Sequence, residues 1–302
     1  MDKLGSLKIT TLAENLVQAG GLGQWGLSFL LELVDGKGDQ RKVLFDTGGH
    51  KEGFLNNMKL LEVDFSDLDA VVISHGHWDH TAATVEAVQE TGGVKVFAHP
   101  LAFYPHISVN REGKMNDSGI PVGERAGDIE AAGGELVLSS KPVEVVLGLW
   151  TTGEVERITS FEGVAPPRKG AKRYYLVDGE EVPCFIQDDM AIWADIENVG
   201  PYAITGCAHS GPINTLLHVK KLGDFQKISG FIGGTHLGGR SDEYLNKTIH
   251  EFGKFGLQML SPCHCTGFKA TALLMNAFPE EFVLNYCCRE LTAGKMPRYK
   301  VR

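Results

Sequence analysis

Four residues of the types that bind metals lie within six positions of this chain. The run His75-Gly76-His77-Trp78-Asp79-His80 follows directly on Ala70 to Ile73, an apolar stretch typical of a buried strand. On an extended backbone, side chains two positions apart point the same way, so His75 and His77 face one side. Asp79 and His80 turn toward a second position. The sequence therefore predicts a buried strand whose end holds two cations close together.

Imidazole and carboxylate ligands together suit zinc, iron or manganese, and their mixture does not choose among these metals. Zinc is the first expectation, with iron and manganese as alternatives. A surface loop rich in histidine is the competing interpretation, but ligand-type residues directly after a buried strand argue against it. Paired metals in such a site activate water or polarise an oxygen of a substrate.

Predicted strands and helices alternate in both halves of the chain. The strands are predicted at 7–12, 26–34, 41–45, 68–74, 94–98, 202–205, 228–232 and 257–260. Helices are predicted at 53–61, from a cap at Thr81 to Glu90, at 242–255, and after the polar tips 206–211 and 264–267. This pattern predicts an α/β fold with two sheets packed face to face and helices outside, a four-layered αββα sandwich. We expect a single domain over 1–302, with a loop-rich insertion at about 99–170 that shapes the substrate site.

Composition narrows the classes of partner. The 302 residues carry a formal net charge of −9 and no clustered Lys and Arg, which disfavours a nucleic-acid partner. The apolar runs are too short to cross a bilayer, and Met1 to Thr10 lacks the features of a secretory signal. Six cysteines are too few for a disulfide scaffold. We therefore expect a cytoplasmic protein that acts on a small molecule and not on a membrane; the oligomeric state stays open.

Two motifs resemble a known superfamily. The segment from Ser74 to Thr81 matches the H-x-H-x-D-H signature of the metallo-β-lactamase superfamily, and Phe45 to Gly48 matches the aspartate motif that precedes it. The tips 206–211 with Asn214, 233–237 and 264–267 are similar to a narrower group, the 7,8-dihydropterin-6-yl-methyl-4-(β-D-ribofuranosyl)aminobenzene 5'-phosphate synthases.

The resemblance implies a dinuclear metal-dependent transferase of methanopterin biosynthesis, acting on a phosphorylated or diphosphorylated pterin-type substrate with loss of pyrophosphate. One fold hosts many chemistries, so two alternatives remain. The first is a metal-dependent hydrolase of a phosphodiester, lactone or thioester. The second is a non-catalytic metal-binding or ligand-binding regulatory protein.

The resemblance also implies the ligand set. His75, His77 and His209 would hold one metal, and Asp79, His80 and His264 the other. The superfamily often has a bridging aspartate where this chain has Gly233-Gly234-Thr235-His236, so His236 either replaces it or faces the substrate. Asp79 and His236 are the candidate catalytic residues. Asp46 is expected either to orient a ligand imidazole or to cap the turn at Gly48.

The candidate substrate residues are His236, Ser210, Asn214 and Thr266. Two tips pass straight into helices at Ser210-Gly211 and Thr266-Gly267, so free backbone N–H groups there could face an anion. Helix capping by Ser210 and Thr266 is the alternative.

Cysteines near these tips are interpreted as buried packing residues. An extended Cys263-His264-Cys265 triplet would put both sulfurs on the face opposite His264, and Cys207 is interpreted in the same way. Five other histidines are predicted to lie on the surface or in loops: His50, His99, His106, His218 and His250. Four charged residues resemble family positions without a derivable role: Glu156, Arg157, Asp188 and Asp189.

Overall fold

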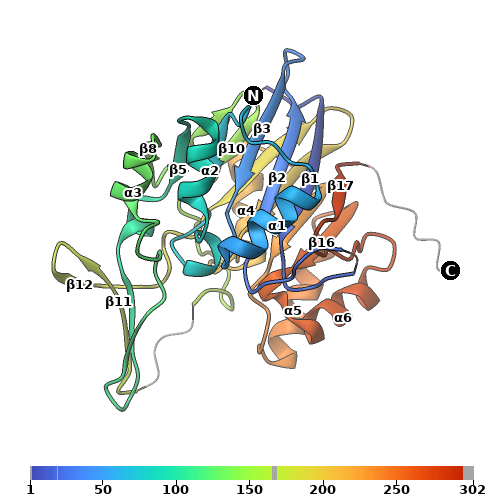
Figure 1. Cartoon of the computed structure of the whole chain (residues 1–302). Coiled ribbons are helices and arrows are strands. Elements are labelled where there is room, and N and C mark those ends of the chain that lie inside the picture. Colours follow the sequence, from blue (N-terminus) through green and yellow to red (C-terminus); the bar gives the residue numbers. More distant parts are fainter. Residues whose placement is uncertain (1, 19, 165–168, 295–302) are drawn as a thin grey trace.

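The computed structural model describes residues 2–18, 20–164 and 169–294 (Figure 1). Residues 1, 19, 165–168 and 295–302, which belong to the predicted domain of 1–302, lie outside this description, and 165–168 also belong to the predicted insertion. Strands of the described residues form sheets of seven, six and four strands. The two larger sheets build the body of the protein.

The seven-stranded sheet has the order β17-β1-β2-β3-β4-β5-β8. Its strands are β1 (Ser6–Ala13), β2 (Ser28–Val34), β3 (Gln40–Phe45), β4 (Ala70–Val72), β5 (Lys95–Ala98), β8 (Glu135–Leu138) and β17 (Glu290–Thr292). The strands from β17 to β3 pair antiparallel, whereas β3, β4, β5 and β8 run parallel. All five strands predicted in the first half are confirmed, with shifted ends.

The six-stranded sheet has the order β16-β15-β14-β13-β10-β9. Its strands are β9 (Glu144–Val146), β10 (Leu149–Thr151), β13 (Ala191–Ile196), β14 (Gly200–Thr205), β15 (Gly230–Gly234) and β16 (Met259–Cys263). β14, β15 and β16 run parallel, and each is followed by a helix, as predicted for the second half. The carboxyl ends of these three strands therefore meet at one edge.

The two sheets pack face to face and helices cover their outer faces, which confirms the αββα architecture (Figure 1). Alternate residues explain this: in β2, Phe29 and Leu31 enter the core between the sheets, whereas Leu30 faces outward. The helices over the first sheet are α1 (Lys51–Leu60), α2 (Thr84–Thr91) and α3 (Ala126–Ala131). Those over the second are α4 (Pro212–Gly223), α5 (Asp242–Phe252) and α6 (Phe268–Ala277).

The stretch 99–170, predicted as a loop-rich insertion, contains several short helices and strands between its loops. It contributes α3 and β8 to one half of the sandwich and β9 and β10 to the other. It also contains a short helix, η2 (Pro100–Phe103), and two strands of the four-stranded sheet β12-β11-β6-β7. That sheet comprises β6 (His106–Val109), β7 (Met115–Asp117), β11 (Lys172–Val177) and β12 (Glu180–Pro183). Strands of three or four residues are too short to show a hydrophobic period, which is why they were missed.

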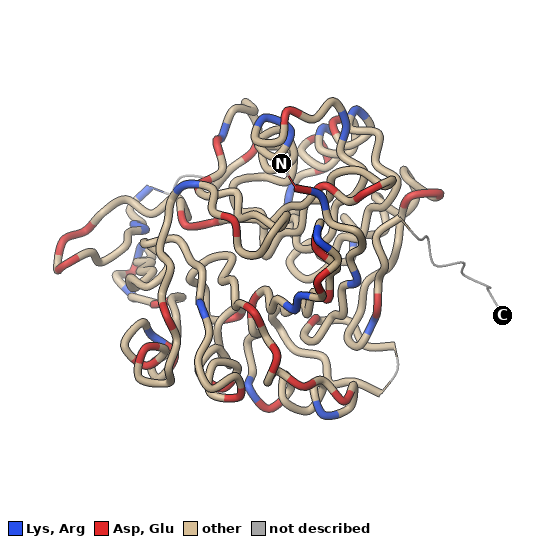
Figure 2. Tube along the Cα trace, turned by 90° about the horizontal axis from the view of Figure 1, so that it is seen from above, with Lys and Arg blue, Asp and Glu red and all other residues tan. Residues whose placement is uncertain are grey.

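Charges of both signs are interspersed along the chain (Figure 2). Lys8, for example, contacts Glu32 at 2.7 Å and Glu290 at 2.9 Å across neighbouring strands. Within the described part of the chain, no helix has the length and apolar character needed to cross a bilayer. The expectations about nucleic acids and cellular location stay predictions.

Candidate metal centre

The six predicted ligands lie at one edge of the sandwich, in segments that follow strands. They are His75 and His77 after β4, Asp79 and His80 in the short helix η1 (Trp78–His80), His209 after β14, and His264 in the short helix η3 (His264–Thr266) after β16. Carboxyl ends of parallel strands meet at one edge of a sheet, and here the edges of both sheets meet. The fold thus gathers residues nearly 190 positions apart.

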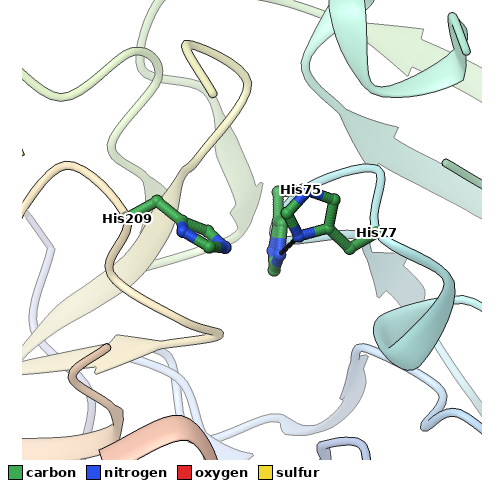
Figure 3. A group of neighbouring side chains, drawn as sticks. All are labelled: His75, His77 and His209. Carbon is green, nitrogen blue, oxygen red and sulfur yellow. Dashed lines mark hydrogen bonds between the residues drawn. The ribbon is translucent and has the colours of Figure 1, made fainter. Parts of the chain in front are cut away.

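The first triad consists of His75, His77 and His209. Their ligand nitrogens lie within 4.8 Å of one another. Nε2 of His75 and Nδ1 of His77 are 3.0 Å apart, and His209 faces both rings from the second sheet (Figure 3). Three imidazole nitrogens that converge on one point are a typical set of protein ligands for one zinc or iron ion.

The second triad consists of Asp79, His80 and His264, whose ligand atoms also lie within 4.8 Å of one another. Oδ2 of Asp79 is 3.4 Å from Nε2 of His264 and 3.9 Å from Nε2 of His80. The rings of His75 and His80 are 4.3 Å apart, so the two triads adjoin. The arrangement can hold two cations as neighbours.

Asp46 orients one imidazole of each triad. Its buried carboxylate accepts hydrogen bonds from the Ser74 N–H (2.7 Å), the Ser74 hydroxyl (2.6 Å) and Nδ1–H of His80 (2.6 Å). Because the Ser74 hydroxyl donates to Asp46, its oxygen is left to accept from Nδ1–H of His75 at 2.9 Å. Both histidines therefore present Nε2 to the centre, as expected for Asp46 in an orienting role.

Two residues that the sequence did not single out hold His264. Asn15 accepts from Nδ1 of His264 at 3.1 Å and donates to its backbone carbonyl at 3.1 Å. Glu14 accepts from the His264 N–H at 2.6 Å. Both follow β1 at the edge where the ligands gather, and polar residues just after a strand were the available signal.

The protonation states of the histidines fit metal binding. Burial lowers the pKa of His75 and His209 well below the usual value and that of His77 to about 3, so these rings are neutral ligands at pH 7. Among the described residues, both nitrogens of buried His209 and Nε2 of buried His264 have no hydrogen-bond partner. Buried polar atoms are normally paired, so these two rings require a partner that accepts a nitrogen lone pair. A metal fits that requirement.

His80 should make metal binding depend on pH. Burial disfavours its charge, but the carboxylates of Asp46 and Asp79 outweigh burial and raise the pKa of His80 to about 9. Below that pH a metal must displace a proton from His80. Apparent affinity should therefore rise about tenfold per pH unit up to about pH 9 instead of levelling off near 6.5.

Proton release on titration of the metal-free protein with zinc at pH 7.5 would measure this effect. We expect His80 to contribute close to one released proton per zinc bound at the second triad. A flat affinity between pH 7 and 9 would contradict the assignment of His80.

Left-handed backbone shapes the tips in the second half of the chain. Ala208, His236 and His264 have φ of 51°, 50° and 52°, which residues other than glycine rarely adopt. The predicted extended triplet at 263–265 is therefore wrong: β16 ends at Cys263 and the chain turns at His264. Cys265 consequently lies near Cys207 and His264, within one group whose ligand atoms are all within 4.8 Å of one another.

His236 lies beside the first triad. Its ring is 4.2 Å from that of His209, and its Nδ1 has no hydrogen-bond partner among the described residues. It also belongs, with Cys207 and His209, to a third group of ligand atoms within 4.8 Å. Its role as ligand or substrate contact stays a prediction, as do the catalytic roles of Asp79 and His236.

The predicted anion site at the start of α4 is occupied by the chain itself. The carboxylate of Glu162 accepts from the N–H groups of Ile213 (3.0 Å) and Asn214 (2.7 Å). Burial raises the pKa of Glu162 to about 7. This carboxylate pairs with N–H groups at the start of α4, for which an anion and a capping side chain were the two alternatives.

The candidate substrate residues at these tips bond to the chain. Oδ1 of Asn214 accepts hydrogen bonds from the N–H groups of Ile158 and Thr159. Its Nδ2 donates to the Ser210 carbonyl. Thr266 donates to the Cys263 carbonyl at 2.6 Å, and the Ser210 hydroxyl accepts from Arg157 at 3.3 Å. These contacts favour structural roles, and substrate contact by the three residues stays a prediction.

A cavity of about 530 Å³ adjoins the first triad. Its lining includes His77, His209, His236, His106, Arg173 and Arg240. The four-stranded sheet contributes His106 from β6 and Arg173 from β11, while Arg240 precedes α5. The cavity is suited to a ligand that carries negative charge.

His106 was missed, because it begins a short strand inside the segment interpreted as loop. It is buried, its ring is 5.1 Å from that of His77, and its Nε2 is 3.5 Å from Asp188. Asp188 accepts from the Gly76 N–H (2.7 Å) and the Tyr175 hydroxyl (2.6 Å), so it ties the ligand loop to β11. His218 is buried within α4, contrary to prediction, whereas His99 lies buried in the loop between β5 and η2. His50 and His250 are exposed, as predicted.

Asp189, Arg157 and Glu156, whose roles the sequence did not indicate, form hydrogen bonds or ion pairs with neighbouring segments. Asp189 accepts from the Ser210 N–H at 2.8 Å, and burial raises its pKa to about 6. Arg157 donates to the carbonyls of Phe185 and Ile186. Glu156 forms an exposed ion pair with Lys221 at 2.6 Å.

Comparison with known proteins agrees with this geometry. The model of the metallo-beta-lactamase superfamily matches residues 26–180. A 7,8-dihydropterin-6-methyl-4-(beta-D-ribofuranosyl)-aminobenzene-5'-phosphate synthase of Methanocaldococcus jannaschii is 32% identical over 98% of both chains. An uncharacterized protein of the same organism is 30% identical over 88% of this chain and 93% of its own. A crystal structure of a metal-dependent hydrolase of the beta-lactamase superfamily has a TM-score of 0.75 at 23% identity, covering 94% of this chain and 98% of its own.

Proposed function

The chain belongs to the metallo-beta-lactamase superfamily, and from that premise we propose that it is a dinuclear metal-dependent enzyme acting on a phosphorylated or diphosphorylated pterin-type substrate. In this proposal it is a transferase like the dihydropterin ribofuranosylaminobenzene phosphate synthase that it resembles. The observation that carries the proposal is the cavity of about 530 Å³, whose lining includes two arginines, Arg173 and Arg240, and two imidazoles of the first triad, those of His77 and His209.

The two triads would hold the cations, zinc being the first expectation and iron or manganese the alternatives. Bound divalent cations would supply positive charge to the oxygens of a diphosphate leaving group. Asp46 orients the ring of His80, and Asn15 orients the ring of His264. Asp188 holds the loop that carries His75 and His77 through the Gly76 N–H.

Arg240 is the best placed residue for the anionic part of the substrate. Its guanidinium lies 4.8 Å from the Tyr244 ring centre and donates to the carbonyls of His236 (3.4 Å) and Gly163 (3.2 Å). These contacts fix the side chain at the cavity wall. A positioned guanidinium binds phosphate oxygens in two parallel hydrogen bonds.

We expect Arg240→Ala to weaken inhibition by pyrophosphate by roughly 10- to 100-fold, the cost of about 1.5–3 kcal/mol for a hydrogen bond to a charged group. The measurement is the inhibition constant of pyrophosphate against metal-loaded protein. Arg111→Ala changes an exposed arginine that does not line this cavity, so it is the matched control and should leave the constant unchanged. Equal constants for Arg240→Ala and the parent would refute the anion site.

The reaction class is tested by pyrophosphate release. Metal-loaded protein would be incubated with a dihydropterin carrying a methylene diphosphate, with and without a ribofuranosylaminobenzene 5'-phosphate. Release that requires both compounds supports the transferase. Release from the diphosphate alone favours the hydrolase, and binding of both without release favours the non-catalytic alternative.

A further inference from the structure

One thiol lies among the ligand atoms of both triads. Sγ of buried Cys207 is 3.2 Å from Nε2 of His80, the nitrogen that His80 offers to the centre. The same sulfur forms three groups of ligand atoms within 4.8 Å: with His75 and His80, with His209 and His236, and with His264 and Cys265. Since these groups draw members from both triads, the sulfur lies between the two metal positions.

The end of β15 has no room for a bridging side chain. A Cβ at Gly234 would lie 2.2 Å from the Gly206 carbonyl oxygen and 2.8 Å from Sγ of Cys265. The tip that carries Cys207 therefore occupies the space into which a side chain at this position would extend. A negative ligand between the cations has to come from another segment.

Charge balance also calls for such a ligand. Asp79 is the one negatively charged member of the two triads, whereas two divalent cations would bring four positive charges into a buried site. Uncompensated buried charge is strongly unfavourable. A thiolate at position 207 would reduce the imbalance by one unit.

We propose that Cys207 binds the metal centre as a thiolate shared by the two triads, in the place that a carboxylate from β15 cannot occupy. The thiol proton passes to solvent when the metal binds. Thiolates suit zinc and iron better than manganese, so this ligand biases the centre toward the softer metals. The inference rests on the metal-binding part of the proposed function and is independent of its pterin chemistry.

Cys265 has a different function in this arrangement. Its Sγ accepts from the His236 N–H at 3.2 Å and faces the Cys207 carbonyl at 3.5 Å. These contacts connect the tips that follow β14, β15 and β16. Cys265 thus positions the neighbouring loops, while Cys207 directs its sulfur at the ligand nitrogen of His80.

Cobalt tests the proposal without any turnover. Metal-free protein would be titrated with Co²⁺ alone, and the near-ultraviolet charge-transfer band of a cobalt-bound thiolate would be recorded together with bound metal and circular dichroism. We expect the band in the parent protein, its loss in Cys207→Ala and Cys207→Ser, and its retention in Cys263→Ala. Cys263 is the matched control, since it is buried one position before His264 but belongs to none of the ligand groups of the described residues.

A second route avoids substitution of Cys207, in case its variants do not fold. The band should persist in Cys265→Ala and in Cys263→Ala, which leaves Cys207 as the sulfur donor at the centre. Cobalt bound without the band in the parent, or a band that survives in folded Cys207→Ala, would overturn the proposal. Failure of the parent to bind cobalt would overturn it together with the metal-binding part of the proposed function.

Discussion

Replacement of His77 by alanine is expected to remove metal from the first triad and to reduce turnover to the limit of detection. Nδ1 of His77 lies 3.0 Å from Nε2 of His75, so its removal leaves the first triad with two of its three imidazoles. The affinity loss should exceed the roughly 10- to 100-fold typical for removal of a group that merely orients a ligand. Metal content and pyrophosphate release would be measured on the same preparation.

The protein should stay folded in this variant, because His77 lies after β4 and outside the core between the sheets. Circular dichroism would check the fold. His250→Ala is the matched control: this histidine is exposed on α5 and should change neither metal content nor rate. Full metal occupancy in His77→Ala would remove the residue from the ligand set.

Asp46→Asn should weaken both metal positions at once, by about 10- to 100-fold in affinity. Oδ2 of Asp46 accepts from His80 and from the Ser74 hydroxyl, and Ser74 in turn bonds to His75. An asparagine that places its NH₂ group at this position would face two donors, so the histidines would lose the tautomers that direct Nε2 to the centre.

The measurement is metal affinity by competition with a chelator at several pH values. Besides the loss of affinity, the rise of affinity with pH should end at a lower pH than in the parent, because the Asp46 carboxylate is one of the two that raise the pKa of His80. Asp35→Asn is the matched control, since Asp35 is also buried and also accepts backbone N–H groups, at Lys37 and Asp39. Loss of affinity at only one triad in Asp46→Asn would contradict the shared orientation of the two triads.

The ligand positions could be predicted because each follows a strand with a strong apolar pattern. Val71 and Ile204 lie in such strands, and the polar tips after them stand out in the sequence. The layer order could be predicted for the same reason. The local sequence pattern is enough to predict the position of a residue that directly follows a strand with such a pattern.

The remaining features depend on pairings between distant segments. Glu162 fills the start of α4 because its loop crosses that helix, and His106 reaches the site because β6 pairs with β11. The turn at His264 depends on Glu14 and Asn15, about 250 positions earlier in the chain. Apart from the polar residues that follow β1, local sequence contains no sign of these contacts. The extended triplet at 263–265 and the placing of His106 on the surface or in a loop were therefore wrong, and a free start of α4 was one of two alternatives left open.

Different residues orient the ligands of the two triads, and this affects how the number of bound cations can change during evolution. Asp46 supports an imidazole in each triad, so a change there affects both cations together. Asn15 and Glu14 contact His264 of the second triad. Substitutions at positions 14, 15 and 264 would therefore weaken the second cation site without changing the contacts of Asp46 to the first triad. We expect selection to keep Asp46 in lineages with such substitutions long after the second cation is lost.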